Sequence, residues 1–142
     1  GKTFVDLDEE IVRRAGKSIP DIFAQEGEAA FRRLETEAAA EAAKHTGQVI
    51  SCGGGIVKTP GNARLLRQNG PVLWIRRPLE ALTVGGGRPL SSSREALEKM
   101  EAERLPLYRA AADGIVENSG SLNQAITAAE EVFYEILDSE RA

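Results

Sequence analysis

The stretch GKTFVDLD, residues 1–8, decides the class of fold because its letters allow two interpretations. G-K-T matches the end of a phosphate-binding loop, G-x-x-x-x-G-K-[ST], in which the lysine and the hydroxyl residue begin a helix. Residues 3–7 instead alternate β-branched or aromatic residues with polar ones, which is typical of a short strand. Because a strand leaves no room for the phosphate-binding helix, we interpret the match at residues 1–3 as a coincidence.

Helix and strand patterns alternate along the rest of the chain. Asp8 is a good N-cap for a helix over residues 9–14 that Gly16 ends, and Ser18 is a good N-cap for the next helix. Pro106 is expected to separate two later helices. The alternation predicts a single α/β domain with a parallel sheet flanked by helices. The other predicted helices cover residues 19–23, 28–44, 60–69, 79–82, 94–104, 107–112 and 122–137, and the later strands cover residues 48–52, 72–75 and 114–117.

The composition is that of an ordinary globular protein, with 42% apolar and 28% charged residues. A net charge of −4 argues against a surface that binds nucleic acid or an anionic membrane. The single cysteine, Cys52, excludes an internal disulfide and fits the reducing cytosol. No apolar run approaches the roughly 20 residues that span a bilayer. We therefore expect a cytoplasmic protein without nucleic-acid or membrane partners.

Two stretches that follow predicted strands could carry chemistry. Asp6 and Asp8 are two positions apart, so in a strand they would face the same side and could bind a metal ion or sugar-like hydroxyls. The alternative is a helix cap next to one acid at the strand end. The three glycines at positions 53–55 would let a ligand approach the backbone closely, or they form only a tight turn.

Three arginines are further candidates. Arg32 has Glu35 three positions later on a predicted helix, an arrangement that also occurs in simple surface ion pairs. Arg104 precedes the expected break at Pro106, where its side chain could be fixed at the rim of a pocket. Arg88 lies in a polar, glycine- and serine-rich stretch, which suits either a lid whose arginine meets a phosphate or a linker.

The order of these motifs is more specific than any one of them. The series F-V-D-L-D, G-K-S-I-P-D-I-F, G-E-x-x-F-R-x-L-E, G-G-G, G-R-P-L and R-L-P-L-Y resembles the shikimate kinase family from residue 1 almost to the C-terminus. The resemblance implies a P-loop kinase fold and ATP-dependent, Mg²⁺-assisted phosphorylation of the 3-hydroxyl of shikimate. In that family the F-x-D-x-D strand is the second strand, and the P-loop strand and helix precede it. The P-loop strand and helix therefore do not form part of residues 1–142.

The resemblance also implies roles for single residues. Asp8 would bind shikimate hydroxyls and orient or deprotonate the one that attacks, and Asp6 would hold Mg²⁺ through water. Arg32 and Arg104 would bind the substrate carboxylate, with Glu35 positioning Arg32. The glycine loop, Gly53, Gly54 and Gly55, would donate backbone N–H groups to the substrate, and Arg88 would reach over the phosphates from a lid at about residues 83–93.

The nucleotide half of such a site is incomplete in this sequence. The P-loop lysine and hydroxyl residue do not match any position, and residues 82–84 and 117–120 do not carry the basic side chains that many family members place near adenine. We expect an upstream segment or a partner domain to supply the P-loop, as the central strand between residues 49–52 and 72–75. The alternative function is a non-catalytic shikimate-binding module, and a gluconate-type kinase is disfavoured by the arginine pair.

Overall fold

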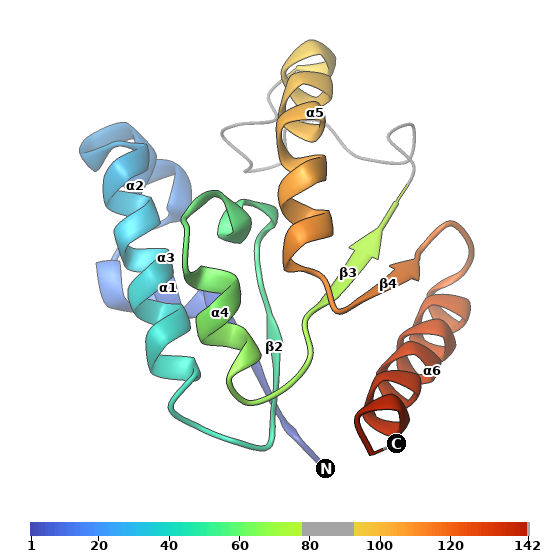
Figure 1. Ribbon diagram of the computed structural model, residues 1–142. Coiled ribbons are helices and arrows are strands. Elements are labelled where there is room, and N and C mark those ends of the chain that lie inside the picture. The colour runs from blue at the N-terminus through green and yellow to red at the C-terminus, as the bar shows by residue number, and fades with distance from the viewer. Residues whose placement is uncertain (78–92, 142) are drawn as a thin grey trace.

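The structure is a computed structural model that describes residues 1–77 and 93–141 (Figure 1). The chain alternates strands with helices, as the sequence predicts. The elements in chain order are β1 (Thr3–Asp6), α1 (Leu7–Ala15), α2 (Ile19–Glu26), α3 (Glu28–Ala42), β2 (Gln48–Ser51), the 3₁₀ helix η1 (Gly54–Lys58), α4 (Asn62–Arg67), β3 (Leu73–Arg76), α5 (Arg94–Ala111), β4 (Gly114–Glu117) and α6 (Leu122–Arg141).

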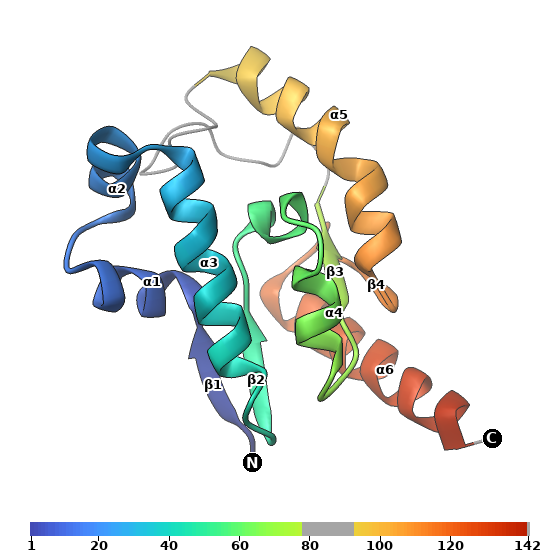
Figure 2. The ribbon, with the colours of Figure 1, turned by 60° about the vertical axis from the view of Figure 1, so that its left-hand side comes forward.

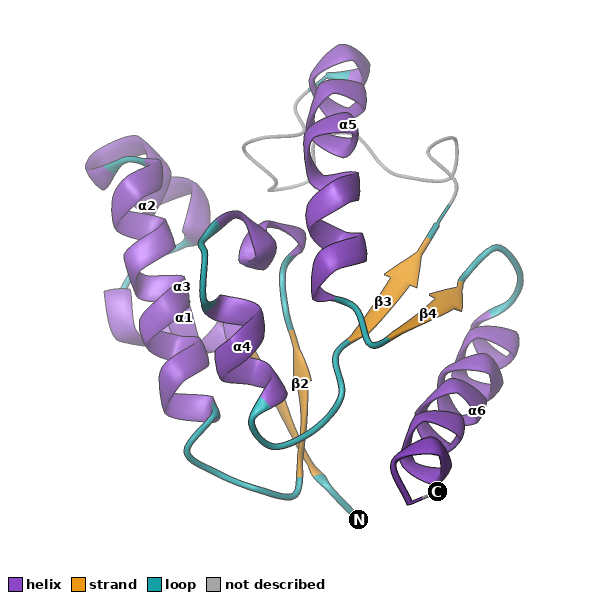
Figure 3. Ribbon diagram, in the orientation of Figure 1, coloured by secondary structure: helices purple, strands orange, loops and turns teal. Residues whose placement is uncertain are grey.

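The strands form two separate parallel pairs rather than one sheet (Figure 3). β1 pairs with β2 so that Phe4 lies opposite Val49, and β3 pairs with β4 so that Ile75 lies opposite Val116. The prediction of parallel pairing is confirmed. Within the described residues β2 and β3 do not pair with each other, and it is between these two strands that we expect a P-loop strand from outside residues 1–142.

The main hydrophobic core lies between the β1–β2 pair and the first three helices, as Figure 2 shows. Val5 and Ile50 point toward this core, whereas Phe4 and Val49 on the opposite face are 65% and 52% exposed. One face of this pair is therefore covered and the other carries exposed apolar side chains. The buried core residues are Leu7, Ile11, Ile22, Phe31, Ala38, Ala39, Ala42 and Ile56.

The β3–β4 pair packs between the last two helices. Trp74 on β3 stacks at 5.4 Å on Tyr108 of α5, and Val116 on β4 is buried. Gly114 at the start of β4 lies under α6, where a Cβ atom would be 2.5 Å from Val132 Cγ1. The close contact between β4 and α6 therefore depends on a residue without a side chain.

We expect Gly114→Ala to lower the free energy of unfolding by about 1–3 kcal/mol, because an added methyl group must displace α6 from β4. Gly70→Ala is the matched control, since a Cβ atom at Gly70 would meet no atom within 4 Å. Urea unfolding of both variants measures the difference. Equal stability of the two variants would contradict the close packing of α6 on β4.

Two predicted element boundaries are wrong. The N-cap of the first helix is Asp6, whose Oδ1 accepts from the N–H of Asp8 at 2.9 Å, and Asp8 itself lies in the first turn. Asp6 has an extended backbone, with φ of −100° and ψ of 114°, directly before the first helical residue, so this acid and not Asp8 occupies the cap position. Gly16 ends this helix in the left-handed conformation, with φ of 69°, as predicted.

The other wrong boundary is at Pro106, which lies inside a continuous α5. Proline removes one helical hydrogen bond, but buried side chains before and after it, Leu97, Arg104 and Ala111, hold both halves of the helix against the protein. The N-cap at Ser18 is confirmed, and α2 runs on to Glu26. The helix predicted over residues 79–82 falls outside the described residues.

None of the helices within residues 1–77 and 93–141 combines the length and the apolar character needed to cross a bilayer.

Candidate functional site

The predicted site residues meet at the carboxyl ends of β1 and β2. The glycine loop, Gly53–Gly55, follows β2, and its last two glycines begin η1, which packs against α5 in the views of Figures 1 and 2. Each glycine faces a different polar side chain. A Cβ atom at Gly53 would lie 3.3 Å from Asp8 Oδ1, and one at Gly54 would lie 3.1 Å from Arg104 Nη1. The prediction that these residues come together is therefore matched by the geometry.

Gly55 faces the arginine of α3. A Cβ atom at Gly55 would lie 2.2 Å from Arg32 Nη1 and 2.7 Å from Cζ, so the guanidinium lies directly on the backbone of the loop. Only glycine permits such a close approach without moving the arginine. The loop is thus more than a tight turn, since its three positions leave space for three functional side chains.

Arg32 is held by two carboxylates. Its Nη1 donates to Glu35 Oε1 at 2.9 Å and its Nε to Glu28 Oε2 at 3.3 Å, while Lys58 Nζ binds the same Glu28 oxygen at 2.8 Å. Glu35 is only 2% exposed, so this is a buried ion pair and not the surface pair that the sequence left open. The network fixes the direction of the Arg32 guanidinium.

The carboxyl group of Glu35 is shifted by its surroundings. Burial raises its pKa above the ordinary value, and the hydrogen bond and charge of Arg32 oppose that rise without cancelling it. The negative charge of Asp8 also raises the pKa, and the positive charge of Arg104 lowers it. These interactions place Asp8, Glu35 and the two arginines in one electrostatic cluster.

We expect stability to fall as pH rises from about 4.5, the ordinary value for Glu35, through its raised folded pKa. In that window the folded chain binds more protons at Glu35 than the unfolded chain does, so a rise in pH favours unfolding. Glu35→Gln should remove this contribution, and the exposed Glu37→Gln is the control. Urea unfolding across the pH range measures it, and identical pH dependence in wild type and Glu35→Gln would refute the buried acid.

Arg104 is the most unusual charge of the cluster. It is only 7% exposed, and among the described residues no carboxylate lies within the 4.0 Å of an ion pair. A buried guanidinium without a carboxylate is costly unless something else satisfies it. Its neighbour on the next turn of α5 is Tyr108, whose hydroxyl donates to Gly54 O at 2.9 Å.

Sequence reasoning assigned no role to Tyr108 or to Asn62. Tyr108 was part of the R-L-P-L-Y motif, and its position four residues after Arg104 was the signal that both lie on one face of a helix. Asn62 is fully buried, accepts from Thr36 Oγ1 at 2.9 Å and donates to Ile56 O at 2.9 Å. It ties η1 to α3, and an isolated Asn gives no such signal in a sequence.

The two aspartates are not related as expected. They do not share one face of a strand, because Asp6 ends β1 and caps α1 while Asp8 lies within α1. Asp8 still reaches the glycine loop, whereas Asp6 is engaged with the N–H of Asp8. In residues 1–77 and 93–141, acidic, histidine and cysteine side chains do not gather in groups of three that could hold a metal. Arg88 and most of the predicted lid fall outside the described residues.

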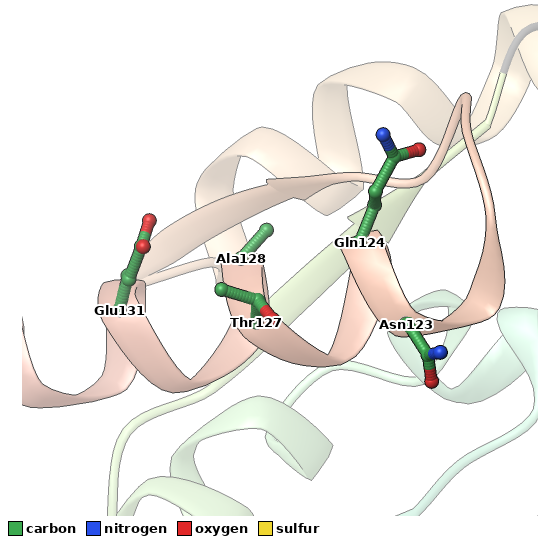
Figure 4. Close-up of a pocket in the computed structure, with 5 residues that line it drawn as sticks. All are labelled: Asn123, Gln124, Thr127, Ala128 and Glu131. Atoms are coloured by element: carbon green, nitrogen blue, oxygen red, sulfur yellow. The ribbon is translucent and has the colours of Figure 1, made fainter.

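A surface pocket elsewhere does not share residues with this cluster. As Figure 4 shows, its five lining residues all come from α6: Asn123, Gln124, Thr127, Ala128 and Glu131. Its lining contains a single carboxylate and no cation, so it offers a ligand fewer charged groups than the cluster on the glycine loop does. The candidate site is therefore the cluster.

The fold and the cluster define a class: an α/β protein of parallel strands that can hold a small anion where the strands end. The comparisons specify it further. A family model described as "Shikimate kinase" matches residues 1–139, so the chain belongs to the shikimate kinase family.

Curated relatives support the same assignment. The shikimate kinase of Stenotrophomonas maltophilia is 45% identical over 117 residues, which are 78% of this chain and 65% of the relative. That of Aromatoleum aromaticum is 42% identical over 121 residues, which are 80% of this chain and 69% of the relative. The aligned part of the chain thus spans about two thirds of the length of these relatives.

Solved structures are similar throughout the chain. A shikimate kinase from Acinetobacter baumannii in complex with shikimate matches with a TM-score of 0.87 and 32% identity, covering 98% of this chain and 80% of that one. One from Aquifex aeolicus matches with a TM-score of 0.74 and 32% identity, covering 99% and 82%. The α/β fold with parallel strands and flanking helices is therefore confirmed.

Proposed function

We propose that the protein transfers the γ-phosphoryl group of ATP to the 3-hydroxyl of shikimate, and that this chain carries the shikimate half of the site. The observation that carries the proposal is the environment of Arg104. Its side chain is a buried cation without a carboxylate among the described residues, and it faces the same glycine loop as Arg32 and Asp8. A ligand with one carboxylate and several hydroxyls matches this set of charges. The family and the shikimate complex of a similar structure support the same substrate.

In this proposal the two arginines bind the carboxylate. Arg104 provides a guanidinium with no described anion, and Arg32 retains donors beyond those used by Glu28 and Glu35, because a guanidinium has five. Guanidinium groups bind carboxylates through paired hydrogen bonds, which fixes orientation as well as affinity. Glu35 and Glu28 position Arg32, and the backbone of the glycine loop would donate N–H groups to the substrate.

Asp8 is proposed to act on the attacking hydroxyl. Its carboxylate lies against Gly53, and the next two glycines of the loop face Arg104 and Arg32. It would orient the 3-hydroxyl and accept its proton as the oxygen bonds to the γ-phosphorus and ADP leaves. Mg²⁺ would neutralise charge on the phosphates, and Asp6, as one carboxylate, suits a water-mediated contact with that ion, which retains most of its waters.

The P-loop and the lid belong to the same proposal. We propose that residues 1–142 form one incomplete domain, to which an upstream segment or a partner domain adds the P-loop strand between β2 and β3. The separation of the two strand pairs and the exposure of Phe4, Val49 and Ile75 support a further covering element. Arg88, in the lid at about residues 83–93, would meet the phosphates. Shikimate and ATP are then the partners, and the cytosol is the proposed location.

The test is formation of shikimate 3-phosphate from ATP and shikimate. A coupled assay for ADP measures the rate of this reaction. The chain is assayed alone and with the segment encoded directly upstream. We expect activity only with the P-loop present. Binding of shikimate without any phosphorylation in the extended protein would favour a non-catalytic binding module instead.

A further inference from the structure

Tyr108 connects two parts of the candidate site that lie far apart in the sequence. Its hydroxyl donates to the carbonyl oxygen of Gly54, 54 residues away, at 2.9 Å. The same hydroxyl approaches the glycine so closely that a Cβ atom there would lie 2.7 Å from it and 3.1 Å from Arg104 Nη1. The hydroxyl and the guanidinium therefore border the same backbone position.

The polarity of these groups is complementary. A phenol that donates its proton to a carbonyl retains lone pairs, and a guanidinium can only donate. Burial raises the pKa of Tyr108, whereas the charge of Arg104 and a hydrogen bond from it lower it, so the two side chains are in direct electrostatic contact. Arg104, which lacks a described carboxylate, thus uses the phenol oxygen as a neutral partner.

The ring of Tyr108 is fixed from the other side. It packs on Trp74 of β3 with 5.4 Å between ring centroids and 33° between planes. Since the ring is held by β3 and the helix α5, its hydroxyl has a defined position toward the glycine loop. A run of three glycines has more conformational freedom than any other tripeptide, so one such hydrogen bond has a large effect on its geometry.

We propose that Tyr108 is a positioning residue, which fixes the Gly54–Gly55 peptide and the Arg104 guanidinium relative to each other for binding of the substrate carboxylate. A peptide unit is planar, so fixing Gly54 O also fixes the direction of the Gly55 N–H, at the residue whose Cβ position faces the Arg32 guanidinium. Tyr108 in this way fixes the positions of the two arginines relative to each other without itself touching the substrate. The inference rests on the proposed function for its substrate.

The variant that tests it is Tyr108→Phe, which keeps the ring on Trp74 and removes only the hydroxyl. Tyr134→Phe is the matched control, because Tyr134 is the other tyrosine of the chain, lies on α6 and is 61% exposed. The first readout needs no ligand: amide hydrogen exchange by NMR at residues 53–58. We expect faster exchange there in Tyr108→Phe, with the rest of the chain unchanged. Unchanged exchange at these residues would overturn the proposal, whether or not the protein binds shikimate.

The second readout is calorimetric titration with shikimate. Loss of one neutral hydrogen bond should weaken binding roughly three- to tenfold in Tyr108→Phe and leave Tyr134→Phe at the wild-type affinity. The same substitution in an Arg104→Met background should have little further effect, because the arginine that it positions is gone. An undiminished effect in that background would contradict positioning of Arg104. Failure of the wild type to bind shikimate would instead reject the proposed function, and the exchange readout would still decide the role of Tyr108.

Discussion

Asp8→Asn is expected to lower the turnover of the protein, assayed with its P-loop segment present, by about 10²–10⁴-fold. This is the contribution typical of a positioned acid–base group. The amide has the shape of the carboxylate and can still hydrogen-bond a hydroxyl, but it cannot accept the proton. Asparagine has as many non-hydrogen atoms as aspartate, so the substitution does not crowd the contact between residue 8 and Gly53. Shikimate affinity should therefore be retained in part while turnover is lost.

The control for this variant is Asp21→Asn, which changes an exposed aspartate in the first turn of α2 in the same way. Turnover and shikimate affinity are measured in the same preparation of each variant. Near-normal turnover in Asp8→Asn would show that Asp8 serves only to bind or to stabilise α1. Equal losses of affinity and turnover would assign it to binding alone.

Arg104→Met is expected to weaken shikimate binding by at least about tenfold, since a charge-assisted hydrogen bond contributes about 1.5–3 kcal/mol. Methionine keeps the apolar stem and removes the charge. Because the guanidinium is buried without a carboxylate among the described residues and has the Tyr108 phenol oxygen as its partner, its removal should lower the free energy of unfolding of the ligand-free chain by no more than about 1 kcal/mol. Binding and stability should thus change independently.

Arg109→Met is the matched control, on the same helix but exposed. Calorimetric titration gives the affinities, and urea unfolding gives the stabilities. If Arg104→Met destabilises the ligand-free chain by several kcal/mol, Arg104 has a structural role larger than its hydrogen bond with Tyr108 and is not held ready for a ligand. If it binds shikimate like the wild type, the carboxylate lies elsewhere.

Much of the fold could be predicted from the sequence because its signals are local. Ser18 with Pro20, and Gly16 in the left-handed conformation, mark helix ends by their own backbone chemistry. The sequence cannot distinguish the cap at Asp6 from one at Asp8, because both residues are aspartates that suit a helix N-cap. Only the path of the backbone decides between them. The sequence favours a helix break at Pro106, because proline is unfavourable inside a helix. In the structure, burial of α5 side chains outweighs this preference, and that burial is not visible in the local sequence.

The members of the candidate site could be proposed from the sequence, whereas their arrangement could not. The motifs identified the glycines, the arginines and Asp8, but which glycine faces which side chain follows from the path of the loop. The buried state of Glu35 and the contact of Tyr108 with Gly54 depend on residues far apart in the chain. The roles assigned to these site residues stay predictions, as do those of Asp6 and Arg88.

Shikimate is proposed to bind this chain through the carboxylate of the ligand. The most direct measurement is calorimetric titration of the 142-residue chain with shikimate and, separately, with its methyl ester, which keeps the ring and hydroxyls and lacks the charge. We predict that shikimate binds at least about tenfold more tightly than the ester, and that this preference is lost in Arg104→Met. Equal affinity for the acid and the ester, or no binding of shikimate, would contradict the account.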